Sequence, residues 1–258
     1  MRTTINNPDP VIEFLDMVGA SPYEKDARQV RVRGLTAYNL GTMCDTCPFL
    51  YEQVANITPS LSGKMISNML RSGLTSISRD LVDSISTLLP SGEYAVAMLS
   101  TLPKFIEIKK WAAKRKTNLG YHAGYGYIRS DFFAGKKIQV DPFGYVEESI
   151  LPLYSPHLLD KKTIDQFKHQ LKKGERPTAL AVTIVDGKHS MSGDSYSAPD
   201  HFNLMHFLLD GHHKVMAAYK IGREIDILSF LRITGSGAPT AHNHTPSMME
   251  SILATFYG

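Results

Sequence analysis

The feature that most constrains the fold is an alternation of strand and helix patterns between residues 145 and 232. Residues 178–185 read Thr-Ala-Leu-Ala-Val-Thr-Ile-Val, a near-continuous apolar run that is typical of a strand buried on both faces. The whole pattern predicts a strand at 145–153, a helix at 163–173, strands at 178–185 and ending at 209, a helix at 212–221 and a strand at 225–231. This β-α-β-β-α-β order predicts a compact α/β unit with a small mixed sheet.

A glycine turn joins the last predicted strand–helix pair and carries the main candidate binding residues. The turn reads Asp210-Gly211-His212-His213-Lys214. Backbone N–H groups and the helix dipole make a helix start attractive to anions, phosphates above all. Gly211 would allow close approach of a ligand, and Lys214 would add a positive charge one turn into the helix. The histidines could donate hydrogen bonds or exchange protons near neutral pH. The turn therefore predicts a phosphate site.

The same segment resembles the N-terminal domain of ParB and its relatives, which include sulfiredoxin and the free-serine kinases. Those proteins share a Gly-x-x-Arg type turn at a helix start that binds nucleotide phosphates, and here it falls on Gly211, His212, His213 and Lys214. The upstream order also matches over roughly 90 residues, with the strand containing residues 150–153, the helix at 163–173 and the strand after Pro177. The resemblance implies a ParB/sulfiredoxin-like mixed-sheet module that binds ATP or another nucleotide with Mg²⁺.

This resemblance implies an enzyme, either a phosphotransferase (an ATP-dependent kinase) or a nucleotide hydrolase acting on a small-molecule substrate. The candidate catalytic residues are Asp210, His212, His213 and Glu148, with Asp210 or Glu148 orienting a metal ion or a nucleophile. Asp210 could instead be a turn residue. Two departures from the relatives stand out: a lysine replaces the usual arginine, and residues 154–157 lack the acidic residue of the kinase-like members. The alternative is a non-catalytic, nucleotide-gated or DNA-associated regulator.

The N-terminal residues 1–140 read as a mainly helical region, packed against the module at 141–258. Pro10 could begin a helix that carries apolar residues at 11, 12, 14, 15 and 18 and stops at Gly19. Apolar residues then recur every three or four positions from Leu61 to Leu88, with Gly73 dividing two helices. Residues 93–116 again read as helical, with Pro103 forcing a break.

Several weaker patterns lie outside this frame. Cys44 and Cys47 form a lone CxxC; redox chemistry and metal capture remain alternatives to our expectation of two reduced cysteines. Residues 187–203 are long for a connection, which favours a lid over the Asp210 turn or a flexible insertion. The basic run at 109–116 and the pair His242 and His244 are expected to be solvated surface and polar loop residues.

The composition adds limits on partners and location. The net charge of +3 is a mild basic excess, which does not favour nucleic acid as the main partner. No apolar run approaches the length of a membrane span, and residues 1–7 lack the apolar core of a secretory signal. We therefore expect a cytoplasmic protein with no membrane partner; the oligomeric state is left open.

Overall fold

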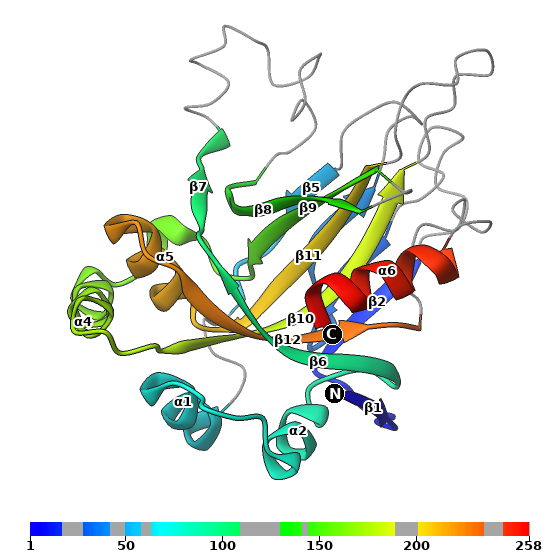
Figure 1. Cartoon of the computed structure of the whole chain (residues 1–258), viewed down its shortest axis with the longest axis horizontal. Coiled ribbons are helices and arrows are strands. Elements are labelled where there is room, and N and C mark those ends of the chain that lie inside the picture. Colours follow the sequence, from blue (N-terminus) through cyan, green and yellow to red (C-terminus); the bar gives the residue numbers. More distant parts are fainter. Residues whose placement is uncertain are drawn as a thin grey trace, which may run out of the picture.

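The computed structural model describes residues 1–16, 28–41, 50–57, 63–108, 130–140, 144–188, 201–234 and 245–257, which form two β-sheets and helices around them (Figure 1). The strands are β1 (Arg2–Ile5), β2 (Ile12–Asp16), β3 (Arg28–Val32), β4 (Leu35–Gly41), β5 (Leu50–Gln53), β6 (Gly92–Thr101), β7 (Lys104–Ile106), β8 (Phe132–Val140), β9 (Gly144–Pro152), β10 (Thr178–Lys188), β11 (His201–Asp210) and β12 (Ile225–Arg232). The helices are α1 (Gly63–Ser72), α2 (Arg79–Ser86), α4 (Lys161–Lys172), α5 (His212–Ile221) and α6 (Thr245–Tyr257), with a short 3₁₀ helix at Pro156–Leu158.

The larger sheet has eight strands in the order β1-β6-β12-β10-β11-β9-β8-β7. Although β6 and β7 lie at opposite ends of this order, only Leu102 and Pro103 separate them in the chain. In Figure 1 they form one long bent ribbon, so the sheet curls between its two ends. The Thr101 hydroxyl at the end of β6 accordingly reaches the side chain of Glu148 on β9.

The predicted β-α-β-β-α-β unit is confirmed and supplies the four central strands. β9, α4, β10, β11, α5 and β12 follow one another, with β10 parallel to β12 and β9 parallel to β11. Asp160 caps the start of α4, and its side chain accepts a hydrogen bond from the Thr163 backbone N–H at 2.7 Å. α5 lies between Gly211 and Gly222, both of which adopt the left-handed conformation. The chain is thus a mixed α/β protein with a large mixed sheet.

The expectation of a mainly helical N-terminal region is wrong. Residues 12–16 form β2, where a helix from Pro10 was predicted, and residues 92–106 form β6 and β7. The Ala-Val-Ala-Met-Leu run in β6 is apolar without alternation, so its period does not separate a buried strand from a buried helix. The two helices predicted between 61 and 88 are confirmed as α1 and α2, with Gly73 (φ 87°) between them.

The strands from residues 1–140 belong to the same architecture as the later ones. A boundary at residue 140 would fall between β8 and β9, which are hydrogen-bonded neighbours in the large sheet. β6 likewise pairs along its length with β12. The predicted unit therefore shares its sheet with β1, β6, β7 and β8.

Two layers cover the large sheet. Its outer face, which includes Leu180, Val182 and Ile184, packs against the four-stranded sheet β2-β3-β4-β5 and against α1 and α2. Its inner face carries two apolar clusters: Ala179 and Ala181 pack with α4 and α5, and Val185 packs with α6. The described helices include none that is long and apolar enough to cross a membrane.

Candidate functional site

The predicted turn lies at the end of β11, where Gly211 begins α5 with φ 96°. A Cβ at this position would lie 2.7 Å from the Cβ and 2.8 Å from the Cα of Ala179 on the neighbouring strand. Both the left-handed conformation and this close approach require glycine. The residue therefore fixes the contact between the turn and β10, in addition to shaping the start of the helix.

Lys214 points into the protein, where it forms an ion pair with Asp210. Its ammonium donates to the Thr178 backbone carbonyl at 2.8 Å and to Asp210 Oδ1 at 3.3 Å, and the Ser67 hydroxyl donates to Asp210 Oδ2 at 2.5 Å. Only 3% of Lys214 and 6% of Asp210 are exposed. Burial lowers the pKa of Lys214, and the charge of Asp210 opposes that shift. The ammonium thus supports the Asp210 carboxylate inside the protein, whereas the sequence placed it against a ligand.

The two histidines of the turn act as acceptors for backbone N–H groups. His212 Nε2 accepts from Tyr154 at 3.3 Å, and His213 Nε2 accepts from Asp160 at 3.2 Å. An imidazole nitrogen that accepts a hydrogen bond carries no proton, so both rings are neutral with the proton on Nδ1. Burial lowers the pKa of His213, against the opposing charges of Asp160 and Asp210. These histidines fasten α5 to the ends of β9 and α4.

The cover over the turn is α1. Ile66 and Leu70 are buried on its inner side, and the adjacent Ser67 makes the contact to Asp210. Gly63 begins this helix with φ 71° and Gly73 follows it with φ 87°. Residues 189–200 of the expected lid lie outside the described residues. Their flanks, at the Lys188↔His201 pair, are about 30 Å from Asp210, nine residues along β11.

Glu148, the fourth predicted catalytic residue, does not join the turn. It lies opposite Leu204, six residues and about 20 Å along β11 from Asp210. Its Oε1 is 3.1 Å from His206 Nε2, and its Oε2 accepts from the Thr101 hydroxyl at 2.5 Å and from the Lys136 backbone N–H at 2.9 Å. Burial raises the pKa of Glu148, but these hydrogen bonds outweigh burial and lower it.

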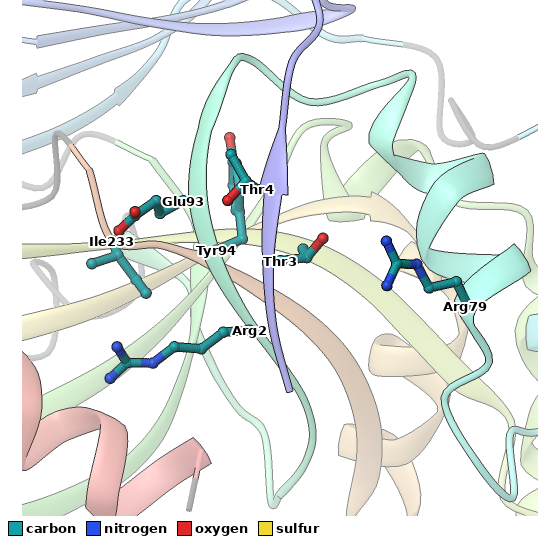
Figure 2. Close-up of a pocket in the computed structure, with 7 residues that line it drawn as sticks. All are labelled: Arg2, Thr3, Thr4, Arg79, Glu93, Tyr94 and Ile233. Atoms are coloured by element: carbon teal, nitrogen blue, oxygen red, sulfur yellow. The ribbon is translucent and has the colours of Figure 1, made fainter.

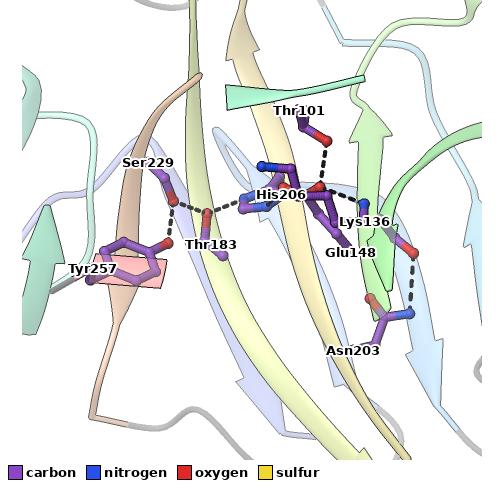
Figure 3. Close-up of polar contacts among 9 residues, drawn as sticks. Thr101, Lys136, Glu148, Thr183, Asn203, His206, Ser229 and Tyr257 are labelled. Atoms are coloured by element: carbon purple, nitrogen blue, oxygen red, sulfur yellow. Dashed lines mark hydrogen bonds and ion pairs between the residues drawn. The ribbon is translucent and has the colours of Figure 1, made fainter. Parts of the chain in front are cut away.

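A buried series of hydrogen bonds continues from Glu148 across the inner face of the sheet (Figure 3). His206 Nδ1 is 2.7 Å from the Thr183 hydroxyl, Thr183 is 2.6 Å from the Ser229 hydroxyl, and Ser229 is 2.5 Å from the Tyr257 hydroxyl. We call Tyr257, Ser229, Thr183, His206 and Glu148 the polar chain. It lies on the same face as the two apolar clusters of the inner face, between the residues that pack with α5 and those that pack with α6.

The sequence analysis missed four of the five members of the polar chain. Thr183, His206 and Ser229 each interrupt a run of apolar residues within a strand, on the side of the pleat that becomes the inner face. Polar residues at that position in three strands were the available signal. Their meeting depends on the strand order, which the sequence pattern does not give.

A surface cavity of about 430 Å³ lies beside the edge strand β1, between α2 and the end of β12 (Figure 2). In this view the Arg2 and Glu93 side chains lie on one side of β1 and Arg79 lies on the other. Arg2 is 3.3 Å from Glu250, and Arg79 is 3.9 Å from Asp83, so both arginines have acidic neighbours. None of the residues predicted as functional lines this cavity.

The structure bears on the metal prediction only in part and does not describe the residues of the thiol prediction. Within the ranges given above for the described chain, no three His, Cys, Asp or Glu side chains gather as metal ligands would. The predicted features Cys44, Cys47, His242, His244 and the basic run at 109–116 lie outside the described residues.

Comparison with known proteins gives no further assignment. No protein-family model, curated protein or solved structure matches this chain.

Proposed function

We propose that the chain is a nucleotide-binding enzyme of the ParB/sulfiredoxin-like type, with phosphates held at the first turn of α5. Its reaction would be phosphoryl transfer to a hydroxyl or hydrolysis of the nucleotide, with Asp210 as general base. The observation that carries the proposal is the 2.5 Å hydrogen bond from the Ser67 hydroxyl to Asp210 Oδ2. A general base must accept a hydrogen bond from the attacking hydroxyl or water. Asp210 accepts such a bond from Ser67 directly beside the start of α5.

Each group of the turn has a separate role in this proposal. Backbone N–H groups at the start of α5 and the helix dipole would hold the phosphates. Lys214 would keep Asp210 ionised through their 3.3 Å contact, without touching the phosphates. The histidines would fix the first turn of the helix through their bonds to Tyr154 and Asp160.

Ligand entry requires α1 to move, because this helix places Ser67 against Asp210. The glycines at either end of α1 have positive φ values, which suits a segment that changes its backbone direction there. Ser67 would then leave Asp210, and the hydroxyl of a substrate or a water would take its place. In the closed arrangement Ser67 stands where the acceptor would bind.

The expected Mg²⁺ does not fit at Asp210. One carboxylate oxygen is 3.3 Å from the Lys214 ammonium and the other accepts the Ser67 hydroxyl, so a cation already occupies the neighbourhood that the metal would need. Glu148 is too far away to share a metal ion with Asp210, because it lies about 20 Å along β11, within the polar chain. Any Mg²⁺ would therefore arrive with the nucleotide phosphates, and the proposal assigns no protein ligand to it.

A non-catalytic, nucleotide-gated regulator is the second candidate. The mutual neutralisation of Lys214 and Asp210 favours it, since a paired and buried carboxylate is a stable structural element without any turnover. In this case the ligand would displace α1 and the moved helix would signal to a partner. The two candidates share the phosphate site and differ in whether the nucleotide is turned over, by phosphoryl transfer or by hydrolysis.

The phosphate site is tested by calorimetry with ATP, ADP, CTP, GTP and pyrophosphate, each with and without Mg²⁺. His213→Glu adds one negative charge at the start of α5, and Lys220→Gln removes one positive charge near the end of the same helix. We expect the first change to weaken binding by about tenfold or more and the second to change it about twofold or less. No binding by the wild type, or equal effects of the two variants, would contradict the site.

Turnover separates the enzyme from the regulator. Ser67→Ala removes the hydroxyl that occupies Asp210, so an enzyme should turn over the nucleotide faster in this variant than in the wild type. The control is Ser84→Ala, because the Ser84 hydroxyl donates to the Asp80 carbonyl within α2 at 2.7 Å. Binding without turnover of the nucleotide in the wild type and in both variants would favour the regulator.

A further inference from the structure

The polar chain is continuous from the C-terminal helix to a deeply buried carboxylate. Its four links measure 2.5, 2.6, 2.7 and 3.1 Å from Tyr257 through Ser229, Thr183 and His206 to Glu148. His206, Thr183 and Ser229 are each 0% exposed, and Glu148 is 3% exposed. A polar series across an apolar interior is costly unless its members are satisfied; here the three inner members each have a partner on both sides, and Glu148 also accepts from Thr101 and Lys136.

The directions of the hydrogen bonds follow from the ionised state of Glu148. A carboxylate can only accept, and a neutral imidazole has one donor and one acceptor nitrogen, so a neutral His206 donates from Nε2 and accepts from the Thr183 hydroxyl at Nδ1. Each hydroxyl then donates toward His206 and accepts from its outer neighbour, beginning with Tyr257. Burial raises the pKa of Tyr257, which keeps this hydroxyl protonated and able to donate. All hydroxyls in the series therefore point the same way.

The outer end of the polar chain lies beside a surface cavity. Tyr257 is partly exposed, with its hydroxyl buried, and it lines a cavity of about 260 Å³ together with Met1, Arg2, Ala95, Glu250, Leu253 and Ala254. The titratable side chains that face the interior series are Glu148 from β9, His206 from β11 and Tyr257 from α6. The cavity also carries the charged side chains of Arg2 and Glu250, which form an exposed ion pair.

We propose that the polar chain is a proton relay between this cavity and the Glu148 carboxylate. A proton accepted by the Tyr257 oxygen is matched by transfer of the Tyr257 hydroxyl proton to Ser229, and Ser229 and Thr183 pass their protons on in turn. His206 receives a proton at Nδ1 and gives its Nε2 proton to Glu148 Oε1. The result is a neutral carboxyl group and a neutral imidazole in its other tautomer. Histidine is suited to this step because its two nitrogens accept and donate on opposite sides.

The inference is tested by the exchange of the His206 ring proton with water, followed by NMR in protein labelled with ¹⁵N-histidine. His206→Gln identifies the signal by removing it. A relay should let this proton exchange faster than the most protected backbone amides of β10 and β11, although the ring is 0% exposed. If the ring proton exchanges no faster than those amides, its exchange requires opening of the sheet, and the proposal is overturned.

Three variants separate a relay from a purely structural role. Thr183→Val breaks the series next to His206 and leaves the Tyr257–Ser229 bond intact, whereas Tyr257→Phe breaks it at α6. Because a relay works in series, both changes should slow exchange about tenfold or more while the backbone amides keep their protection. The control is Tyr94→Phe, which removes another buried tyrosine hydroxyl, bonded to the Pro90 carbonyl and outside the series.

A structural role predicts the opposite sign. Loosening of α6 in Tyr257→Phe would let water reach the interior and speed the exchange of His206, with little change in Thr183→Val. Faster exchange in either variant, or an unchanged rate in both, would overturn the relay.

Discussion

Replacing Lys214 by methionine tests whether this lysine serves the protein interior or a ligand. Methionine keeps most of the side-chain volume and removes the ammonium, which lies 3.3 Å from Asp210 Oδ1 and 2.8 Å from the Thr178 carbonyl oxygen. Asp210 would remain 6% exposed but would lose the charge of the Lys214 ammonium. The variant therefore removes one partner from a buried ion pair.

The expected loss is large for a single substitution. Removal of one partner from a buried ion pair costs about 3–5 kcal/mol, compared with a total stability of about 5–15 kcal/mol for an ordinary domain. Pairing Lys214→Met with Asp210→Asn removes both charges, so the double variant should regain at least half of the loss. Urea denaturation followed by circular dichroism at neutral pH measures each free energy of unfolding.

A lysine at the surface provides the matched control. Lys137 lies 2.6 Å from Glu147, and the side chains are 55% and 36% exposed. Water screens this pair, so Lys137→Met should cost less than about 1 kcal/mol. If Lys214→Met costs as little as Lys137→Met, the ammonium is not held in a buried ion pair and the reasoning about the turn fails.

Two further predictions concern glycine geometry and acid stability. Gly211→Ala should cost more than about 2 kcal/mol because it adds a clash with Ala179 to the strain of φ 96°, whereas Gly222→Ala, with φ 61° and no atom within 4 Å, should cost about 1 kcal/mol. Urea titrations of both variants measure the two losses of stability, and equal losses would show that the close contact of Gly211 with Ala179 does not require glycine. Because the pKa of Glu148 lies below its ordinary 4.5, its stabilisation is complete above that pH and is lost as pH falls through the folded-state pKa. Glu148→Gln should therefore lose less stability than the wild type as the pH falls below about 4.5, and parallel curves would contradict the assigned shift.

The sequence predicted the centre of the fold because its signals there are local. The apolar run at 178–185 indicates a strand buried on both faces, and β10 is such a strand. Gly211 and Gly222 mark the two ends of α5, and Asp160 caps α4 through its side chain. Each of these features acts within a few residues, so the sequence alone is sufficient to place it.

The errors in the N-terminal part come from ambiguous apolar spacing. Val11, Ile12, Phe14 and Leu15 fit one face of a helix, yet Ile12 and Phe14 also alternate along β2. β6 is apolar on both faces because one of them belongs to the inner face of the large sheet and the other packs in the core shared with the second sheet. Tertiary contacts decide between helix and strand in such segments.

The candidate site was predicted in position but not in orientation. The turn begins α5 as expected, but the sequence placed Lys214 toward a ligand because nothing local shows what covers it. Its cover is α1, which brings Ser67 to Asp210 across 143 positions of sequence. The separation of Glu148 from the turn likewise depends on strand register. Long-range pairing of this kind leaves no period or motif in a single sequence.

The most direct test of the central claim is a titration of ¹⁵N-labelled protein with ATP, followed through its backbone amide signals. We predict that the amides of His212, His213 and Lys214 shift with added ATP and that the amides of α1 around Ser67 lose protection against exchange as the helix lifts. Pyrophosphate should produce the same pattern if the phosphates are the group recognised. Shifts confined to other parts of the chain, or none at all, would contradict a phosphate site at the start of α5.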